Sequence, residues 1–305
     1  MRPLLLLLAV ALLAGAEVDD LWFLDEARGR NLGVKVYHPD AGDGPWPVVL
    51  VSHALGGSQW GYVYLGRHLA AHGIVSIHCT HPGSDWLLWD GKGMGTALGN
   101  LRRAAADPAV WRERPRDLGF LLDRLDEFER RVPALAGRLA RDRVAAIGHS
   151  LGAYTVLALA GLRPTLPEGE LRLDDPRFRA VVAMSPQGTG DFLPAGSWSG
   201  IVRPVLLISG TRDDEPMAGR GHGLPWRMQA WEGIPEGAKH LFVIDGATHM
   251  TFAAGGLGEK AVPAHLDLIC TATSAFLAAV LADPAREFSP PALAGATWDQ
   301  PLRAR

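Results

Sequence analysis

The sequence has little cysteine, little net charge and few long apolar runs. Only two cysteines occur in 305 residues, which excludes a disulfide framework, and their spacing matches no zinc pattern. Lys and Arg number 30 against 33 Asp and Glu, so the formal net charge is −3 and no basic footprint for nucleic acid is visible. Apolar residues make up 48% and charged residues 21%, the balance of a folded protein rather than a disordered one.

The N-terminus carries an apolar run that is too short to span a membrane. Residues 4–13 form an unbroken apolar run of ten after Arg2, whereas a spanning helix needs about 20. Residues 14–16 provide a small-x-small cleavage site. We therefore expect a signal peptide over residues 1–16, cut after Ala16, and a secreted or periplasmic protein without a stable membrane span. A misassigned start and a membrane anchor are the alternatives.

Short apolar runs alternate with helical patterns along the remaining chain. The expected strands cover residues 32–37, 47–52, 74–79, 144–147, 181–184, 204–209 and 241–244, and the expected helices cover residues 60–72, 115–131, 151–162 and 264–281. This alternation predicts an α/β protein with a mostly parallel central sheet and helices on both faces, in a single domain over residues 17–305. Ligands of such sheets bind beyond the carboxyl ends of the strands.

Two segments lack a clear pattern. Residues 84–114 contain glycine and tryptophan without a period, so we expect a long loop or partial lid there. Pro115 is then expected near the first turn of the helix that follows. The proline- and alanine-rich tail from Asp283 is expected to wrap over the surface.

A nucleophile-elbow motif lies between an expected strand and an expected helix. Residues 148–152 read Gly-His-Ser-Leu-Gly, which fits G-x-S-x-G. The glycines suit the tight turn, which lifts the Ser150 hydroxyl clear of the sheet. The pentapeptide alone is weak evidence, and an N-capping serine is the alternative. Its place after residues 144–147 favours a catalytic serine.

A serine nucleophile needs a base and an acid, and both occur after later strands. Asp213 follows the strand at 204–209, and His249 follows the strand at 241–244. The order Ser150, Asp213, His249 is the serine–acid–histidine order of α/β-hydrolases. The adjacent Asp214 is the alternative acid. His149 fills the variable position of the elbow and is expected to be structural.

Acyl transfer also requires donors for the developing oxyanion. The backbone N–H of Leu151, directly after the nucleophile, is the first candidate. The second is the Leu55 N–H, in a loop with paired glycines that follows the strand at 47–52. A glycine-rich turn without a donor role is the alternative for Leu55.

Other residues invite weaker interpretations. His78 and His81 have a metal-like spacing but no further ligand cluster, so no metal and no cofactor is expected. Cys79 and Cys270 are expected to be buried free thiols, although an oxidising compartment leaves a disulfide open. Six tryptophans fall in or beside segments between strands: Trp86, Trp89, Trp111, Trp198, Trp226 and Trp231. Some of them are candidates for an apolar acyl or alcohol pocket, and packing under long loops is the favoured alternative for any single one.

The chain resembles the secreted branch of the α/β-hydrolase superfamily often labelled "predicted dienelactone hydrolases". That branch is similar to platelet-activating-factor acetylhydrolases and cutinase-like polyester hydrolases. The matching stretches are residues 52–58, 81–85, 114–117, 148–154, 209–214 and 248–252. The resemblance implies Ser150, Asp213 and His249 as the triad and Leu55 and Leu151 as oxyanion donors.

The sequence departs from this pattern at two positions. True dienelactone hydrolases have a cysteine nucleophile where this elbow carries Ser150, so the label does not set the substrate. Ala54 stands where many relatives have glycine. We expect a serine esterase that cleaves small-molecule or polymeric esters through an acyl-enzyme. The alternatives are a lipase, amidase or acyltransferase with the same triad, or a non-catalytic binding protein.

Overall fold

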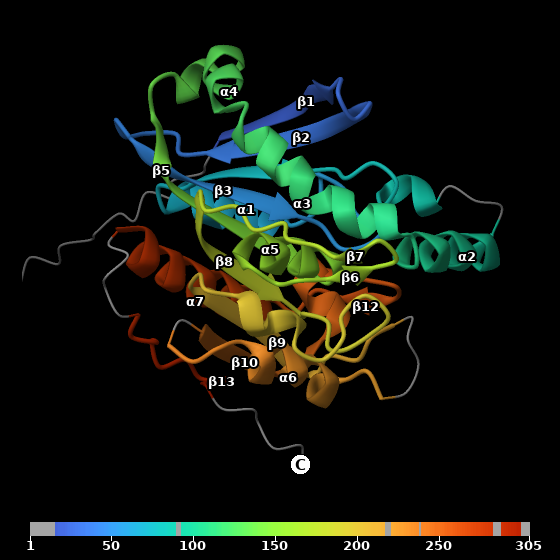
Figure 1. Ribbon diagram of the computed structural model, residues 1–305. Helices are drawn as coiled ribbons and strands as arrows, with labels where there is room; N and C mark the ends of the chain where they lie inside the picture. The colour runs from blue at the N-terminus through green and yellow to red at the C-terminus, as the bar shows by residue number, and fades with distance from the viewer. Residues whose placement is uncertain (1–15, 90–92, 217–220, 238, 283–287, 300–305) are drawn as a thin grey trace, which may run out of the picture.

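A nine-stranded sheet forms the centre of the computed structural model, which describes residues 16–89, 93–216, 221–237, 239–282 and 288–299. The strand order is β1-β2-β4-β3-β5-β8-β9-β10-β13, with β1 at one edge and β13 at the other (Figure 1). The six strands from β4 to β10 in this order run parallel, and the pairs β1–β2, β2–β4 and β10–β13 are antiparallel.

The strands of this sheet are β1 (Ala16–Asp25), β2 (Arg30–His38), β3 (Trp46–Ser52), β4 (Val75–Cys79), β5 (Leu139–His149), β8 (Phe178–Met184), β9 (Val205–Arg212), β10 (Lys239–Thr248) and β13 (Ala296–Trp298). The helices are α1 (Val63–Ala71), α2 (Met94–Ala105), α3 (Pro108–Leu122), α4 (Leu125–Arg131), α5 (Leu151–Ala160), α6 (Leu224–Gly233) and α7 (Pro263–Ala282). Short elements complete the described chain: β6 (Thr165–Leu166) with β7 (Gly169–Glu170), β11 (Gly255–Gly256) with β12 (Glu259–Lys260), and the 3-10 turns η1 (Trp86–Trp89), η2 (Pro133–Leu135), η3 (Ser197–Gly200) and η4 (His249–Ala253).

Two hydrophobic cores cover the two faces of the sheet. Successive side chains of a strand point to opposite faces. Val48 and Leu50 of β3 therefore join the core that contains α3 and α5. Val49 and Val51 join the core that contains α1 and α7. The expectation of an α/β protein with helices on both faces of a mostly parallel sheet is confirmed.

Helix α7 is long and apolar enough to cross a membrane by length and composition alone. Within the described residues it packs on the sheet, and Ile269, Phe276 and Leu277 are buried in one of the cores. The helix therefore has the surroundings of a core helix.

The expectation for residues 84–114 is wrong. This segment contains η1, α2 and the first half of α3 rather than a long loop. The buried positions of α2 are Ala97, Leu101 and Ala104, and two of these are alanines. The apolar period of α2 is therefore faint in the sequence.

The expected position of Pro115 is also wrong, because it lies inside α3 rather than near its start. Proline has no N–H to donate to the carbonyl four residues earlier, which here belongs to Trp111. The Tyr154 hydroxyl of α5 donates to that carbonyl at 2.9 Å. A tertiary contact thus satisfies the group that the proline leaves free.

Several expectations concern the ends of the chain. The signal peptide falls mainly on residues 1–15, which lie outside the described residues, and so does the start of the tail at 283–287. The later part of the tail contains β13, which pairs with β10.

Cys79 and Cys270 are both free and belong to different cores, so the structure contains no disulfide between them.

Candidate active site

The turn between β5 and α5 holds Ser150 in a strained conformation. Its φ is 54° and its ψ is −120°, a backbone conformation that residues other than glycine rarely adopt. A Cβ on Gly148 would lie 1.9 Å from the Gly152 carbonyl oxygen, and a Cβ on Gly152 would lie 2.1 Å from the Ser52 carbonyl oxygen. Both glycines of the motif are therefore required by close backbone contacts.

The structure brings Ser150, Asp213 and His249 together at the carboxyl ends of β5, β9 and β10. The Ser150 Oγ lies 3.1 Å from His249 Nε2, and Asp213 Oδ1 lies 3.1 Å from His249 Nδ1. Ser150, His249 and Asp213 are all buried, whereas Asp214 is exposed. The geometry thus distinguishes the two adjacent aspartates, and only Asp213 faces the histidine.

The Asp213 carboxylate is held ionised by its neighbours. Burial by itself raises its pKa, but the Arg227 charge and the His249 hydrogen bond outweigh burial, and the pKa of Asp213 is lowered. Ser185 Oγ donates to Asp213 Oδ1 at 2.9 Å, and Ser209 Oγ donates to Asp213 Oδ2 at 2.8 Å. An ionised carboxylate can orient an imidazole and stabilise the imidazolium.

Three residues around Asp213 carry no motif that pointed to them: Ser185, Ser209 and Arg227. Ser185 follows β8 and Ser209 lies in β9, so the rule that ligands gather at strand ends could have indicated both. Arg227 lies within α6 and carries no sequence signal. Only the folding of α6 against the strand ends brings it to the site.

The candidate oxyanion loop lies between β3 and α1. The Ala54 N–H donates to Tyr62 Oη at 3.0 Å, and the Gly56 N–H donates to the Ser84 carbonyl at 2.9 Å. Within the described part of the chain, no protein group accepts the N–H of Leu55 or Leu151. Both residues line the pocket beside Ser150, so both N–H groups are free for a ligand oxygen.

A buried arginine holds this loop in place. Arg114 of α3 donates to Ser84 Oγ at 2.7 Å, to Ser52 Oγ at 3.0 Å and to Thr155 Oγ1 at 3.0 Å, and it also donates to the His53 carbonyl. Burial lowers the pKa of Arg114 to about 10, so it stays charged at neutral pH. The guanidinium therefore joins β3, the loop after β4 and α5.

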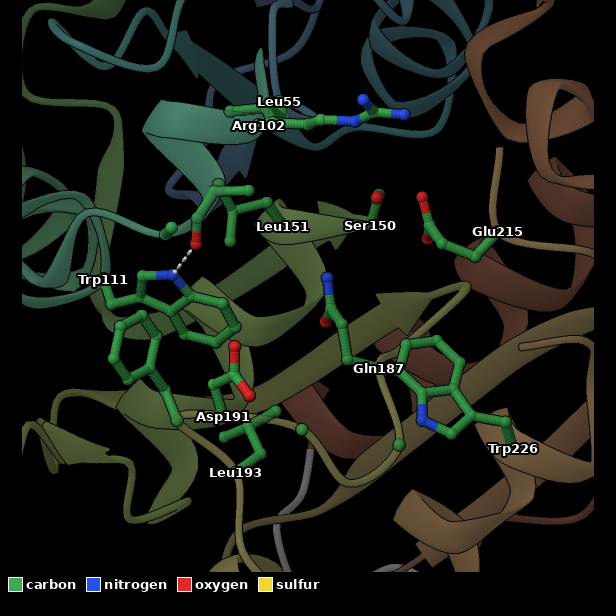
Figure 2. Close-up of a pocket in the computed structure, with 15 residues that line it drawn as sticks. Leu55, Arg102, Trp111, Ser150, Leu151, Gln187, Asp191, Leu193, Glu215 and Trp226 are labelled. Atoms are coloured by element: carbon green, nitrogen blue, oxygen red, sulfur yellow. Dashed lines mark hydrogen bonds between the residues drawn. The ribbon is translucent and has the colours of Figure 1, made fainter. Parts of the chain in front are cut away.

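A pocket of about 330 Å³ opens beside Ser150. In Figure 2, Trp111 and Trp226 stand on opposite sides of the pocket and Gln187 lies between them, below Ser150. The indole N–H groups of Trp111 and Trp226 donate to backbone carbonyls at 2.8 Å each, which leaves the ring surfaces for apolar contact. Glu215, Asp191 and Arg102 add charged groups to the lining.

The structure places the other predicted tryptophans and the histidine pair elsewhere. Trp198 is buried in the core, and Trp86 and Trp89 are exposed on η1. His78 contacts Ser76 Oγ and the Gly61 carbonyl, while His81 contacts Ser52 Oγ and Asp117. Both histidine rings are thus committed to hydrogen bonds within the fold, and the described residues contain no cluster suited to a metal ion.

His149 connects the nucleophile turn to the oxyanion loop. Its Nδ1 lies 3.0 Å from Tyr62 Oη, which accepts the Ala54 N–H, and its ring lies 4.8 Å from the His249 ring. Burial holds the pKa of His149 well below its ordinary value, so this ring is neutral. His149 therefore supports the site without adding charge to it.

Comparison with known proteins gives a structural relative. No family model matches the chain, and no curated protein matches its sequence. The chain is similar to the solved structure of a ferulic acid esterase from Streptomyces cinnamoneus, with a TM-score of 0.60 and 20% sequence identity over 94% of this chain and 95% of that one. At this identity the likeness shows the fold, and the chain has the α/β-hydrolase fold expected from its sequence.

Proposed function

We propose that the protein is a serine hydrolase that cleaves carboxylic esters through an acyl-enzyme intermediate. The contact between Ser150 Oγ and His249 Nε2 at 3.1 Å carries this proposal, because it joins a nucleophile on a strained turn to a general base. The esterase among the structural relatives supports the same reaction class.

The proposed reaction assigns a role to each of these residues. Ser150 attacks the ester carbonyl while His249 takes the hydroxyl proton, and His249 then protonates the leaving alcohol. Asp213 holds the imidazole tautomer. The N–H groups of Leu55 and Leu151 bind the oxyanion, and water attacks the acyl-enzyme to release the acid.

The finer assignments are part of the proposal. We infer that the protein is secreted or periplasmic, on the basis of residues 1–16, and that it belongs with the secreted branch that its motifs resemble. The apolar walls of the pocket favour an ester with an apolar or aromatic group over a highly charged one.

Hydrolysis of p-nitrophenyl esters from acetyl to palmitoyl, with an ester of ferulic acid added, tests the proposal. The Ser150→Ala variant should lose about 10⁴–10⁶-fold in kcat without unfolding, because the nucleophile is removed. Equal turnover by a folded Ser150→Ala sample would contradict the mechanism. A preference for long chains would indicate a lipase, and product formation with an added alcohol would indicate an acyltransferase.

A further inference from the structure

A guanidinium is buried directly against the candidate triad. Arg227 is fully buried, and it donates to the carbonyls of Asp213, Ser185 and Pro186 at 2.9, 3.1 and 3.1 Å. Its Nη2 lies 2.8 Å from His249 Nδ1. Arg227 thus fixes the loops that carry the acid, and it also places a positive charge beside the catalytic base.

That charge opposes the proposed chemistry unless another group offsets it. General-base catalysis turns His249 into an imidazolium, and a like charge at short range disfavours this form. The Nδ1 proton belongs toward the Asp213 carboxylate, so the Arg227 contact then brings two donors together. Asp213 Oδ1 lies 2.9 Å from Arg227 Nε, so this carboxylate faces both the guanidinium and the imidazole. Glu215 Oε2 lies 3.3 Å from Arg227 Nη2 and supplies a second negative charge.

Among the residues that the structure describes, three charged groups surround His249 and its partners. Ser150 and Ser185 are neutral, and the buried His149 ring is neutral as well. Asp213 and Glu215 contribute −2 and Arg227 contributes +1, so the surroundings of the imidazole carry −1 when all three are ionised. This is the charge that an isolated aspartate would supply to a triad.

We propose that Arg227 and Glu215 form a compensated positioning pair that sets the proton affinity of His249. Arg227 holds the loops that carry Asp213 and Ser185 in place. Glu215 restores the negative charge that stabilises the His249 imidazolium. Because Glu215 also lines the pocket, this pair connects the substrate side of the site to the base. The inference rests on the proposed serine-esterase function.

The proposal predicts opposite pH shifts for the two partners. In Arg227→Met the loss of the positive charge favours the imidazolium, so the acid limb of the kcat/KM profile should move up by about one pH unit. In Glu215→Gln the loss of the negative charge disfavours the imidazolium, so the limb should move down by about half a pH unit. A purely structural role would lower kcat without these opposite signs.

Two further variants serve as controls for this test. Asp214→Asn removes a charge from the same loop on an exposed side chain and should leave the acid limb in place. Arg227→Lys keeps the charge and should keep the limb near its original pH, even if kcat falls. If Arg227→Met does not fold, the downward shift in Glu215→Gln decides the question alone.

Two readouts distinguish this inference from the proposed function. The titration midpoint of His249, followed by NMR of its ring proton, should move in the same directions as the acid limb without requiring turnover. If Glu215→Gln leaves the acid limb and the midpoint unshifted, or shifts them upward, the proposed role of Arg227 and Glu215 is wrong. The proposed ester hydrolysis by Ser150 would still stand. Activity that survives in Ser150→Ala would overturn the function itself.

Discussion

At the scale of single residues, the site depends on hydroxyl groups that support the acid. Ser185 has a positive φ of 55°, donates to Asp213 Oδ1 at 2.9 Å and lies 2.8 Å from His249 Nδ1. Hydrogen bonds to charged groups are worth about 1.5–3 kcal/mol, which corresponds to roughly tenfold or more in rate. We expect Ser185→Ala to lower kcat by about tenfold with little change in KM.

Steady-state kinetics on an ester substrate would measure this effect. Ser199→Ala is the matched control, because Ser199 is an exposed serine whose hydroxyl donates to the Gly196 carbonyl, away from the triad. An unchanged kcat in a folded Ser185→Ala protein would show that Ser209 and Arg227 suffice to hold Asp213.

At the scale of elements, α3 holds the oxyanion loop through Arg114. Removal of this side chain leaves the His53 carbonyl and three buried hydroxyls without the Arg114 donor. We expect Arg114→Met to lower the free energy of unfolding by about 3–5 kcal/mol and kcat by at least about tenfold, because the loop loses its anchor. KM should change less than kcat.

Denaturant unfolding and ester kinetics check the two parts of this prediction. Arg116→Met provides the control, since Arg116 lies on the same helix but is exposed and bonds Glu113 at 3.3 Å. A stable Arg114→Met enzyme with normal kcat would mean that the Gly56–Ser84 backbone bond and the Ala54–Tyr62 bond hold the loop without it.

At the scale of the whole molecule, buried histidines make the stability depend on pH. Burial lowers the pKa of His78 to about 3 and holds those of His53, His81 and His149 well below 6.5. Below pH 6.5 the unfolded chain therefore binds protons that the folded protein does not. Each such histidine costs up to about 1.4 kcal/mol per pH unit, down to its folded pKa.

We expect the free energy of unfolding to fall by several kcal/mol between pH 7.5 and pH 5. The lowered pKa of Asp213 adds to this loss only at lower pH, as the pH falls through the folded value. Urea unfolding at a series of pH values measures the slope. His78→Asn should make the slope shallower by one histidine's share, and a flat profile would contradict the burial of these rings.

The sequence by itself indicated most of the central strands along the chain, and it pointed to Ser150 and His249 as candidate site residues. Continuous β-branched runs indicate buried strands whatever their partners, and the G-x-S-x-G turn is a local requirement of backbone packing. The order of Ser150, Asp213 and His249 along the chain followed from the same local rules. The edge strands β1 and β13 escaped prediction, because β1 alternates buried and exposed apolar residues and β13 has only three residues.

Only the tertiary structure decided which charges meet at the site. Asp213 and Asp214 are chemically equal in the sequence, and the end of β9 buries one and exposes the other. Contacts between segments far apart in the chain decide three further features. These are the helix at residues 94–105, the position of Pro115 within α3, and the approach of Arg227 to His249. Long-range packing selects such contacts, and local patterns do not encode them.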